Sequence, residues 1–211
     1  MAGSLDGPVS RHLNRRLSVP IAAALARTPA TPNFVSVVAF AIALGSLGLL
    51  AAGRNIEGAV LIQVSSIVDG VDGDLARAKG MASRFGGLFD SVLDRYADAA
   101  IAGGAAWYAL EHEDWPAPLT IGLAAMVAFL LVSYSRARLE SEGGRDAASE
   151  LVGIASRDVR LLLLAVGVAA GQAYWTLAVV GALSYATVAW RLRAFSRRSS
   201  PARAVLPADG S

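Results

Sequence analysis

Long uncharged runs, separated by short charged segments, dominate the pattern of hydrophobic and polar positions along the chain. Residues 34–52 form nineteen positions without a charge, which at about 1.5 Å per helical residue nearly span a hydrocarbon core of roughly 30 Å. Further apolar stretches cover residues 58–67, 85–110, 119–134 and 161–190. The last is too long for one ordinary span, and Gly171-Gln172 is a plausible break. The pattern therefore predicts an all-α, polytopic membrane protein with six transmembrane helices.

The segment before the first span has a different pattern. Residues 10–27 mix arginines with Leu13, Leu17, Ile21 and Leu25 at helical spacing. This spacing predicts an amphipathic helix that lies in the membrane interface, although a basic arm without structure is an alternative. We divide the chain into an interfacial helix and entry segment (1–33), a six-helix domain (34–195) and a disordered C-terminal tail (196–211).

The distribution of charge between the spans indicates an orientation. The 211 residues contain 55% hydrophobic side chains and no cysteine, so no disulfide framework is expected. Cations gather before span 1, between spans 2 and 3, between spans 4 and 5, and after span 6, whereas the alternate loops have few. By the positive-inside rule, six spans place both termini and these loops in the cytoplasm, in the cell membrane. Five spans would put the arginine-rich end outside.

Four aspartates stand out within this apolar chain. Asp69 and Asp72 are three residues apart on one predicted helix, and Asp90 and Asp94 are four apart on the next. Carboxylates that face one another in a low dielectric repel strongly, and hard divalent cations relieve that repulsion. The spacing predicts a site for two metal ions. The alternative is a solvated loop whose acids merely end two helices, but Asp98 continues the four-residue period into the third span.

The acids belong to a longer motif. Asp69-x-x-Asp72-Gly73-x-x-Ala76-Arg77, eight residues, then Gly86-x-x-x-Asp90-x-x-x-Asp94 resembles the signature of the CDP-alcohol phosphotransferase family at every fixed position. The resemblance implies that an acceptor hydroxyl attacks the β-phosphorus of a CDP-alcohol and releases CMP.

The resemblance also implies roles for the motif residues. Two Mg²⁺ ions, which Mn²⁺ or Ca²⁺ could replace, would be held by Asp69, Asp72, Asp90 and Asp94. Asp94 would also be the catalytic general base. The residues expected to bind the CDP group are Asp72, Gly73, Ala76, Arg77 and Gly86. The implied partners are a CDP-alcohol donor, a phosphorylated polyol acceptor, the lipid bilayer and a second copy of the chain, with no nucleic acid.

The acceptor is indicated by segments outside the motif. Residues 133–144 and 156–160 resemble those of family members that use phosphorylated acceptors, and Arg138, Arg157 and Arg160 are expected to converge on the acceptor phosphate. Arginines that only fix the topology are the alternative. Residues 6–18 resemble the start of the membrane domain of di-myo-inositol-phosphate-phosphate synthases. No cytidylyltransferase domain precedes them here, which leaves a stand-alone enzyme or a fragment.

These resemblances predict transfer from CDP-inositol or CDP-diacylglycerol to an inositol-phosphate-like acceptor. A phospholipid synthase of the phosphatidylglycerophosphate type is a further possibility. A cation transporter is the alternative of another class, but intramembrane acids of transporters usually lie at the midplane in broken helices. The acids of this chain lie beside a basic loop at one end of the predicted spans.

Overall fold

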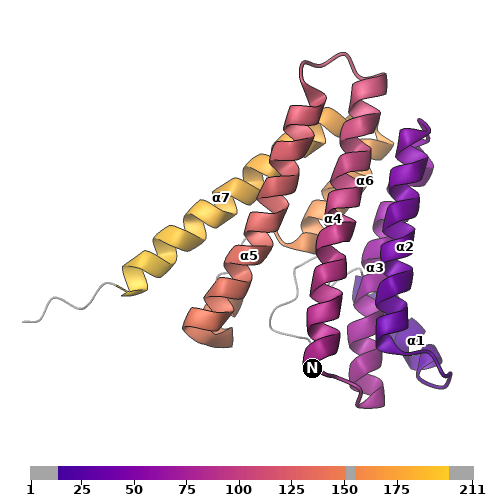
Figure 1. Ribbon diagram of the computed structural model, residues 1–211, viewed down its shortest axis with the longest axis vertical. Coiled ribbons are helices and arrows are strands. Elements are labelled where there is room, and N and C mark those ends of the chain that lie inside the picture. The colour runs from indigo at the N-terminus through magenta and orange to yellow at the C-terminus, as the bar shows by residue number, and fades with distance from the viewer. Residues whose placement is uncertain (1–13, 151–154, 200–211) are drawn as a thin grey trace, which may run out of the picture.

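The computed structural model describes the backbone of residues 14–150 and 155–199, and their side chains except those of residues 143–150 and 198–199. This part of the chain folds into helices and contains no strand, as the hydropathy pattern predicts (Figure 1). The helices are α1 (Arg15–Leu25), α2 (Pro32–Ala51), α3 (Asn55–Lys79), α4 (Arg84–His112), α5 (Pro118–Glu150), α6 (Arg157–Ala169) and α7 (Ala173–Ser199).

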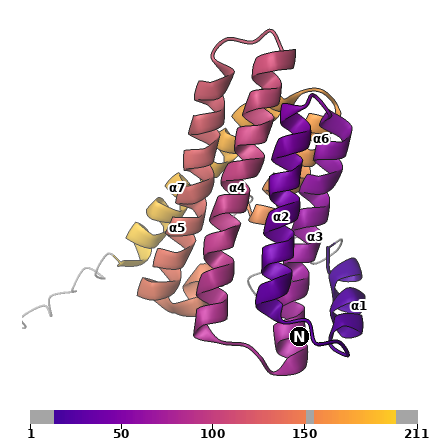
Figure 2. The same cartoon turned by 45° about the vertical axis from the view of Figure 1, so that its right-hand side comes forward.

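The helices form a bundle with α4 between two groups. On one side α4 packs against α2, which also packs against α3, and on the other side it packs against α5 and α7. Helix α6 joins the groups, because it contacts both α3 and α7. Helix α1 lies beside the lower part of α3, as Figure 2 shows.

Small residues let the central helices approach closely. A methyl group on Gly122 of α5 would lie 2.3 Å from Cβ of Ala106 in α4. One on Gly104 of α4 would lie 2.9 Å from Cα of Leu47 in α2. Because real Cβ atoms do not approach so closely, glycine at these two positions sets the distance between α4 and its neighbours.

The helix ends follow the expected local chemistry. Thr31 caps α2, with its Oγ1 accepting a hydrogen bond from the backbone N–H of Phe34 at 3.3 Å, and Pro32 occupies the first turn. Gly171 has a φ of 68° between α6 and α7, which confirms the predicted break. The loop of residues 80–83 joins the two motif helices.

The predicted number of spans is supported only in part. Within the part of the chain that the structure describes, three helical segments are long and apolar enough to cross a membrane: Pro32–Ala51, Pro118–Glu142 and Ala173–Arg197. Helix α6 has 13 residues and is therefore about 20 Å long, shorter than a hydrocarbon core of roughly 30 Å. Its apolar run ends at Gly171, where the chain turns back into α7.

Helix α1 lies in the N-terminal segment for which the sequence predicts an interfacial helix, and the end of α7 enters the segment predicted as a disordered tail. The predicted interfacial segment contains α1, on which Leu17, Val19 and Ile21 are exposed while Ser18 and Ala22 are buried. Residues 1–13 of that segment lie outside the described part. Helix α7 continues to Ser199, past the predicted domain end at 195, and residues 200–211 of the predicted tail are likewise outside it.

Candidate active site

The motif aspartates meet where α3 and α4 face each other. Asp69 and Asp72 come from the second half of α3, and Asp90 and Asp94 from the first half of α4. One carboxylate oxygen each of Asp69, Asp90 and Asp94 lies within 4.8 Å of the others. Asp72 stands beside this group, where it is buried and accepts a hydrogen bond from the Ser36 hydroxyl of α2.

A guanidinium group lies against the same carboxylates. Nη1 of Arg157, at the start of α6, lies 2.6 Å from Oδ2 of Asp69 and 2.9 Å from Oδ1 of Asp94. Its Nε donates a hydrogen bond of 3.0 Å to Oδ1 of Asp98. Repulsion among the acids is thus reduced by a cation from another helix, and the site has a strong preference for positive charge.

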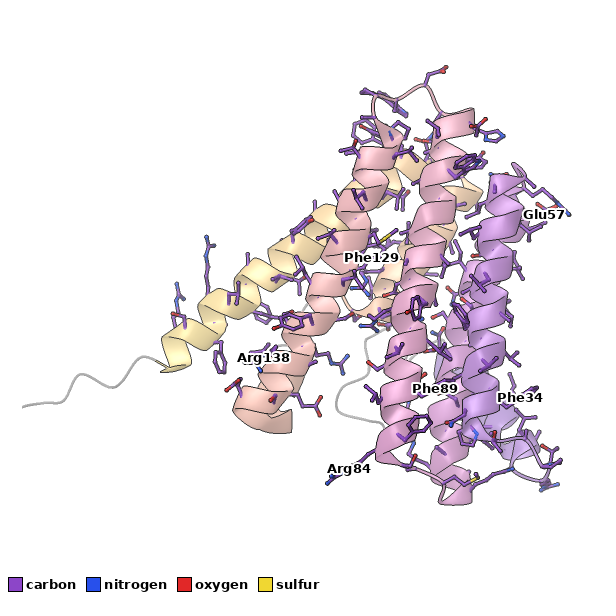
Figure 3. The ribbon with its side chains drawn as sticks, viewed as in Figure 1. Phe34, Glu57, Arg84, Phe89, Phe129 and Arg138 are labelled. Atoms are coloured by element: carbon purple, nitrogen blue, oxygen red, sulfur yellow. The ribbon has the colours of Figure 1, made fainter. Side chains whose placement is uncertain are left out.

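A second arginine lies deeper in the bundle. Arg160 is 2% exposed, and its Nη2 donates a hydrogen bond of 3.1 Å to Oδ2 of Asp98. Its guanidinium carbon lies 4.8 Å from the ring centre of Phe129, which is labelled on α5 in Figure 3. Its Nη1 is buried without a hydrogen-bond partner among the described residues.

All five residues predicted to bind the CDP group line one cavity of about 200 Å³. The cavity lies between α2, α3 and α4 and is closed at one end by the loop of residues 81–83. A methyl group on Gly73 would point into this space, at 3.5 Å from Nη1 of Arg77. Arg77 itself is largely exposed and pairs with Asp74 at 2.7 Å. The motif therefore forms the wall of a cavity, with its arginine at the mouth.

A second cavity, of about 290 Å³, adjoins the first at Asp90, which lines both. Asp94 also lines it, and it is rich in cations from four helices: Arg95, Arg136, Arg157, Arg160 and Arg191. Four of its lining residues have buried side-chain atoms without a hydrogen-bond partner in the described part: the acceptor Oδ1 of Asp94, and three atoms that can donate, Nε of Arg95, Oγ of Ser156 and Nη1 of Arg160. Buried donors without partners are costly, so this cavity is suited to an anion that accepts hydrogen bonds.

The structure does not bring Arg138 into the cavity that Arg157 and Arg160 line. Arg138 points away from the second cavity, pairs with Glu142 at 2.6 Å, and lines a separate apolar cavity between α5 and α7. Arg136, two residues earlier, lines the second cavity instead. Positions two apart on an α-helix differ by about 200° around the axis, so Arg136 and Arg138 face nearly opposite sides.

Three arginines of the second cavity were not expected from the sequence: Arg136, Arg95 and Arg191. Asp98 also had no role assigned to it. Arg191 of α7 is 2% exposed and donates hydrogen bonds to the carbonyl of Val132 at 2.6 Å and to Ser135 Oγ at 2.9 Å. Neither Arg191 nor Arg95 has a spacing signal that links it to the motif. Asp98 did have one, the four-residue period that runs from Asp90 through Asp94.

The residues present fit divalent cations. Carboxylate oxygens are the ligands that Mg²⁺ and Mn²⁺ prefer, and three of them already lie within 4.8 Å of one another. Asp72 completes a set of four acids around Asp90, and the two cavities provide room for phosphate oxygens beside them. The donor set and its surroundings therefore suit metal-assisted chemistry on a phosphate group.

Comparison with known proteins identifies the class. The family profile for CDP-alcohol phosphatidyltransferase matches residues 29–195, which include both motif helices and the arginines of the second cavity. The chain belongs to this family, as its motif predicts.

Individual relatives carry inositol-related names. The chain is 46% identical over 200 residues to the bifunctional IPC transferase and DIPP synthase of Rubrobacter xylanophilus, covering 94% of this chain but 45% of that protein. It is 31% identical to the phosphatidylinositol phosphate synthase of Mycolicibacterium smegmatis, covering 92% of this chain and 90% of that one. The chain thus spans less than half of the first relative and nearly all of the second.

Solved structures of a similar enzyme share the fold. The phosphatidylinositol phosphate synthase of Mycobacterium tuberculosis with CDP-DAG bound superposes with a TM-score of 0.71 at 27% identity, covering 84% of this chain and 92% of that one. Its complex with manganese and citrate gives the same TM-score and identity, covering 84% and 88%.

Proposed function

We propose that the chain catalyses transfer of a phosphoalcohol group from a CDP-alcohol to the hydroxyl of an inositol-phosphate-like acceptor, with release of CMP. The observation that supports this reaction best is the pair of cavities that meet at Asp90. One is lined by the motif residues and the other by arginines, so a nucleotide donor and an anionic acceptor can reach the same carboxylates from two sides.

Two Mg²⁺ ions, or Mn²⁺ in their place, fit the proposal. Asp69, Asp72, Asp90 and Asp94 would hold them. When bound, the ions supply charge neutralisation for the diphosphate and for the phosphoryl group in transfer. Four carboxylates and two divalent ions balance in charge, which would leave Arg157 available to another anion.

The chain's own residues then have distinct tasks. Gly73 and Gly86 leave space for the cytidine and diphosphate along the wall of the first cavity, and Arg77 binds the diphosphate at its mouth. Asp94 lines the second cavity and accepts the proton of the acceptor hydroxyl. The hydroxyl oxygen forms a bond to the β-phosphorus, the bond from that phosphorus to the CMP oxygen breaks, and CMP leaves.

The acceptor phosphate would bind in the second cavity. A phosphate monoester carries about −1.5 to −2 charges near neutral pH and offers three acceptor oxygens. Arg157 and Arg160 come from successive turns of α6. Nη1 of Arg160 and Oγ of Ser156, which have no hydrogen-bond partner among the described residues, supply hydrogen bonds. The donor would be CDP-inositol or CDP-diacylglycerol, since both carry the same CDP group.

The membrane arrangement completes the proposal. Helices α2 to α7, with the 13-residue α6 as a short fifth span, would form six spans in the cell membrane, with the site and both termini in the cytoplasm, as the arginine distribution favours. Helix α1 would lie at the cytoplasmic surface, with Leu17, Val19 and Ile21 facing lipid. Homodimerisation is expected from the family resemblance alone.

A matrix of donors and acceptors tests the function. Purified protein in detergent or vesicles is given CDP-inositol or CDP-diacylglycerol with inositol, inositol phosphate or glycerol 3-phosphate, and CMP release is followed. We expect Mg²⁺-dependent release only with a phosphorylated acceptor, and more with inositol phosphate than with glycerol 3-phosphate. Equal rates with free inositol and inositol phosphate would contradict the acceptor assignment. No release with any pair would contradict the proposed function.

A further inference from the structure

A buried carboxylate outside the family motif links the two arginines of α6. Asp98 lies on α4 one turn after Asp94 and is 2% exposed. Its two oxygens have separate partners: Oδ1 accepts from Nε of Arg157 at 3.0 Å and Oδ2 from Nη2 of Arg160 at 3.1 Å. A single side chain of α4 thus fixes two guanidinium groups of another helix.

Asp98 is the contact of Arg157 that metal binding would leave in place. Arg157 also contacts Asp69 and Asp94, but both of these belong to the carboxylate group suited to metal ions. Ions bound there would compete with Arg157 for the same oxygens. Asp98 is outside that group, so its bond to Arg157 does not depend on whether the metal site is filled.

The orientation of the Arg160 side chain depends on Asp98 more strongly than that of Arg157 does. Asp98 is the one carboxylate with which Arg160 pairs in the part of the chain that the structure describes. This bond, together with the Phe129 ring, sets the plane of the guanidinium group. With Nη2 engaged, Nη1 lies at the wall of the second cavity without a hydrogen-bond partner among the described residues.

We propose that Asp98 is a positioning residue for the acceptor: it holds Arg157 and Arg160 at the spacing and orientation that bind the acceptor phosphate. This inference rests on the proposed function. Arginine chains are long and flexible, and ordering them in advance lowers the cost of binding a ligand. Asp98 therefore acts on acceptor affinity through the arginines and not on the reacting atoms.

The test compares Asp98→Asn with the wild type. Asparagine keeps the size and one acceptor oxygen but loses the charge that both arginines share. We expect the KM for inositol phosphate to rise about tenfold or more, as loss of a charge-assisted bond predicts, while the donor KM and the affinity for Mn²⁺ change less than twofold. An unchanged acceptor KM in a folded variant would overturn the proposal, as would an equal loss of donor and acceptor affinity.

A control and a second variant separate positioning from folding. Glu57→Gln breaks the exposed Arg54–Glu57 pair, whose atoms are 2.7 Å apart, and should leave all three quantities unchanged. If Asp98→Asn does not fold because it leaves buried Arg160 without a counter-charge, Arg160→Met and the double variant Asp98→Asn/Arg160→Met replace it. The double variant should have a higher acceptor KM than Arg160→Met, because Arg157 also loses its anchor. Equal acceptor KM values would overturn the proposal, and so would a double variant that fails to fold when Arg160→Met folds.

Failure of this inference can be told apart from failure of the proposed function on which it rests. Wild-type protein without CMP release from any donor and acceptor would refute the function itself. Active wild type with an unchanged acceptor KM in the variant would refute only the role of Asp98.

Discussion

Replacing Arg160 by methionine separates a binding role of this arginine from a structural one. Methionine has a flexible apolar chain that can keep the contact with Phe129 but cannot donate a hydrogen bond. If Nη1 binds the acceptor phosphate, its loss removes a charge-assisted bond of about 1.5–3 kcal/mol, equivalent to roughly a ten- to over a hundredfold rise in KM.

The effect on stability should be smaller than for most buried ion pairs. Removing one partner of a buried pair usually costs about 3–5 kcal/mol, because the other charge is left alone. Here Asp98 keeps its 3.0 Å hydrogen bond from Arg157, so no carboxylate loses its last partner. We therefore expect a folded variant whose melting temperature falls only modestly.

The assay is initial-rate CMP release at a saturating donor concentration and varied inositol phosphate. Arg138→Met is the matched control, because Arg138 pairs with Glu142 in the solvent-exposed part of α5 and lines another cavity. Arg160→Met should raise the acceptor KM and Arg138→Met should not. The reasoning is refuted if the two variants behave alike, or if Arg160→Met only lowers the yield of inserted protein and leaves kinetics per folded molecule normal.

Three further predictions concern the donor, the base and the orientation. Gly73→Ala should raise the donor KM fivefold or more, because a methyl group there takes space that the donor needs, at a cost of about 1–3 kcal/mol in binding free energy. Gly103→Ala is the control: it gives the same gain in helix propensity, and its added methyl meets nothing within 4 Å among the described residues. Asp94→Asn should lower kcat by about 10²–10⁴ while CDP-alcohol binding, followed by calorimetry, stays near wild type; a variant with a tenth of wild-type turnover would require another base. In sealed right-side-out cells, a cysteine at Glu113 should react with an impermeant thiol reagent and one at Ser211 should not; labelling at both positions would rule out the proposed orientation.

The sequence was most informative where the chemistry repeats at helical spacing. The break at Gly171 and the motif aspartates on two successive helices follow from local rules of turn chemistry and periodicity, and the structure has both where the sequence predicts them. The number of spans was harder to infer. Hydropathy reports apolar composition, and α6 is apolar but only 13 residues long.

The arginines show where sequence reasoning reaches its limit. The expectation for Arg157 and Arg160 rests on the resemblance of residues 156–160 to family members that use phosphorylated acceptors, and in the structure both arginines contact Asp98. Arg138 was chosen for its place in a family-like segment, but the rotation of α5 directs Arg136 into the cavity instead. The side chains of Arg95 and Arg191 reach it from α4 and α7, and only the packing of those helices reveals that they lie together.

Metal-dependent CMP release by the wild-type protein is the most direct test of the central claim. Protein freed of metal with a chelator is given a CDP-alcohol and inositol phosphate, then titrated with Mg²⁺ or Mn²⁺, with Asp90→Asn in parallel because Asp90 lines both cavities. The account predicts no release without metal, recovery of release on titration, and little recovery in Asp90→Asn. Full release from metal-free wild-type protein, or a wild-type response from Asp90→Asn, would contradict it.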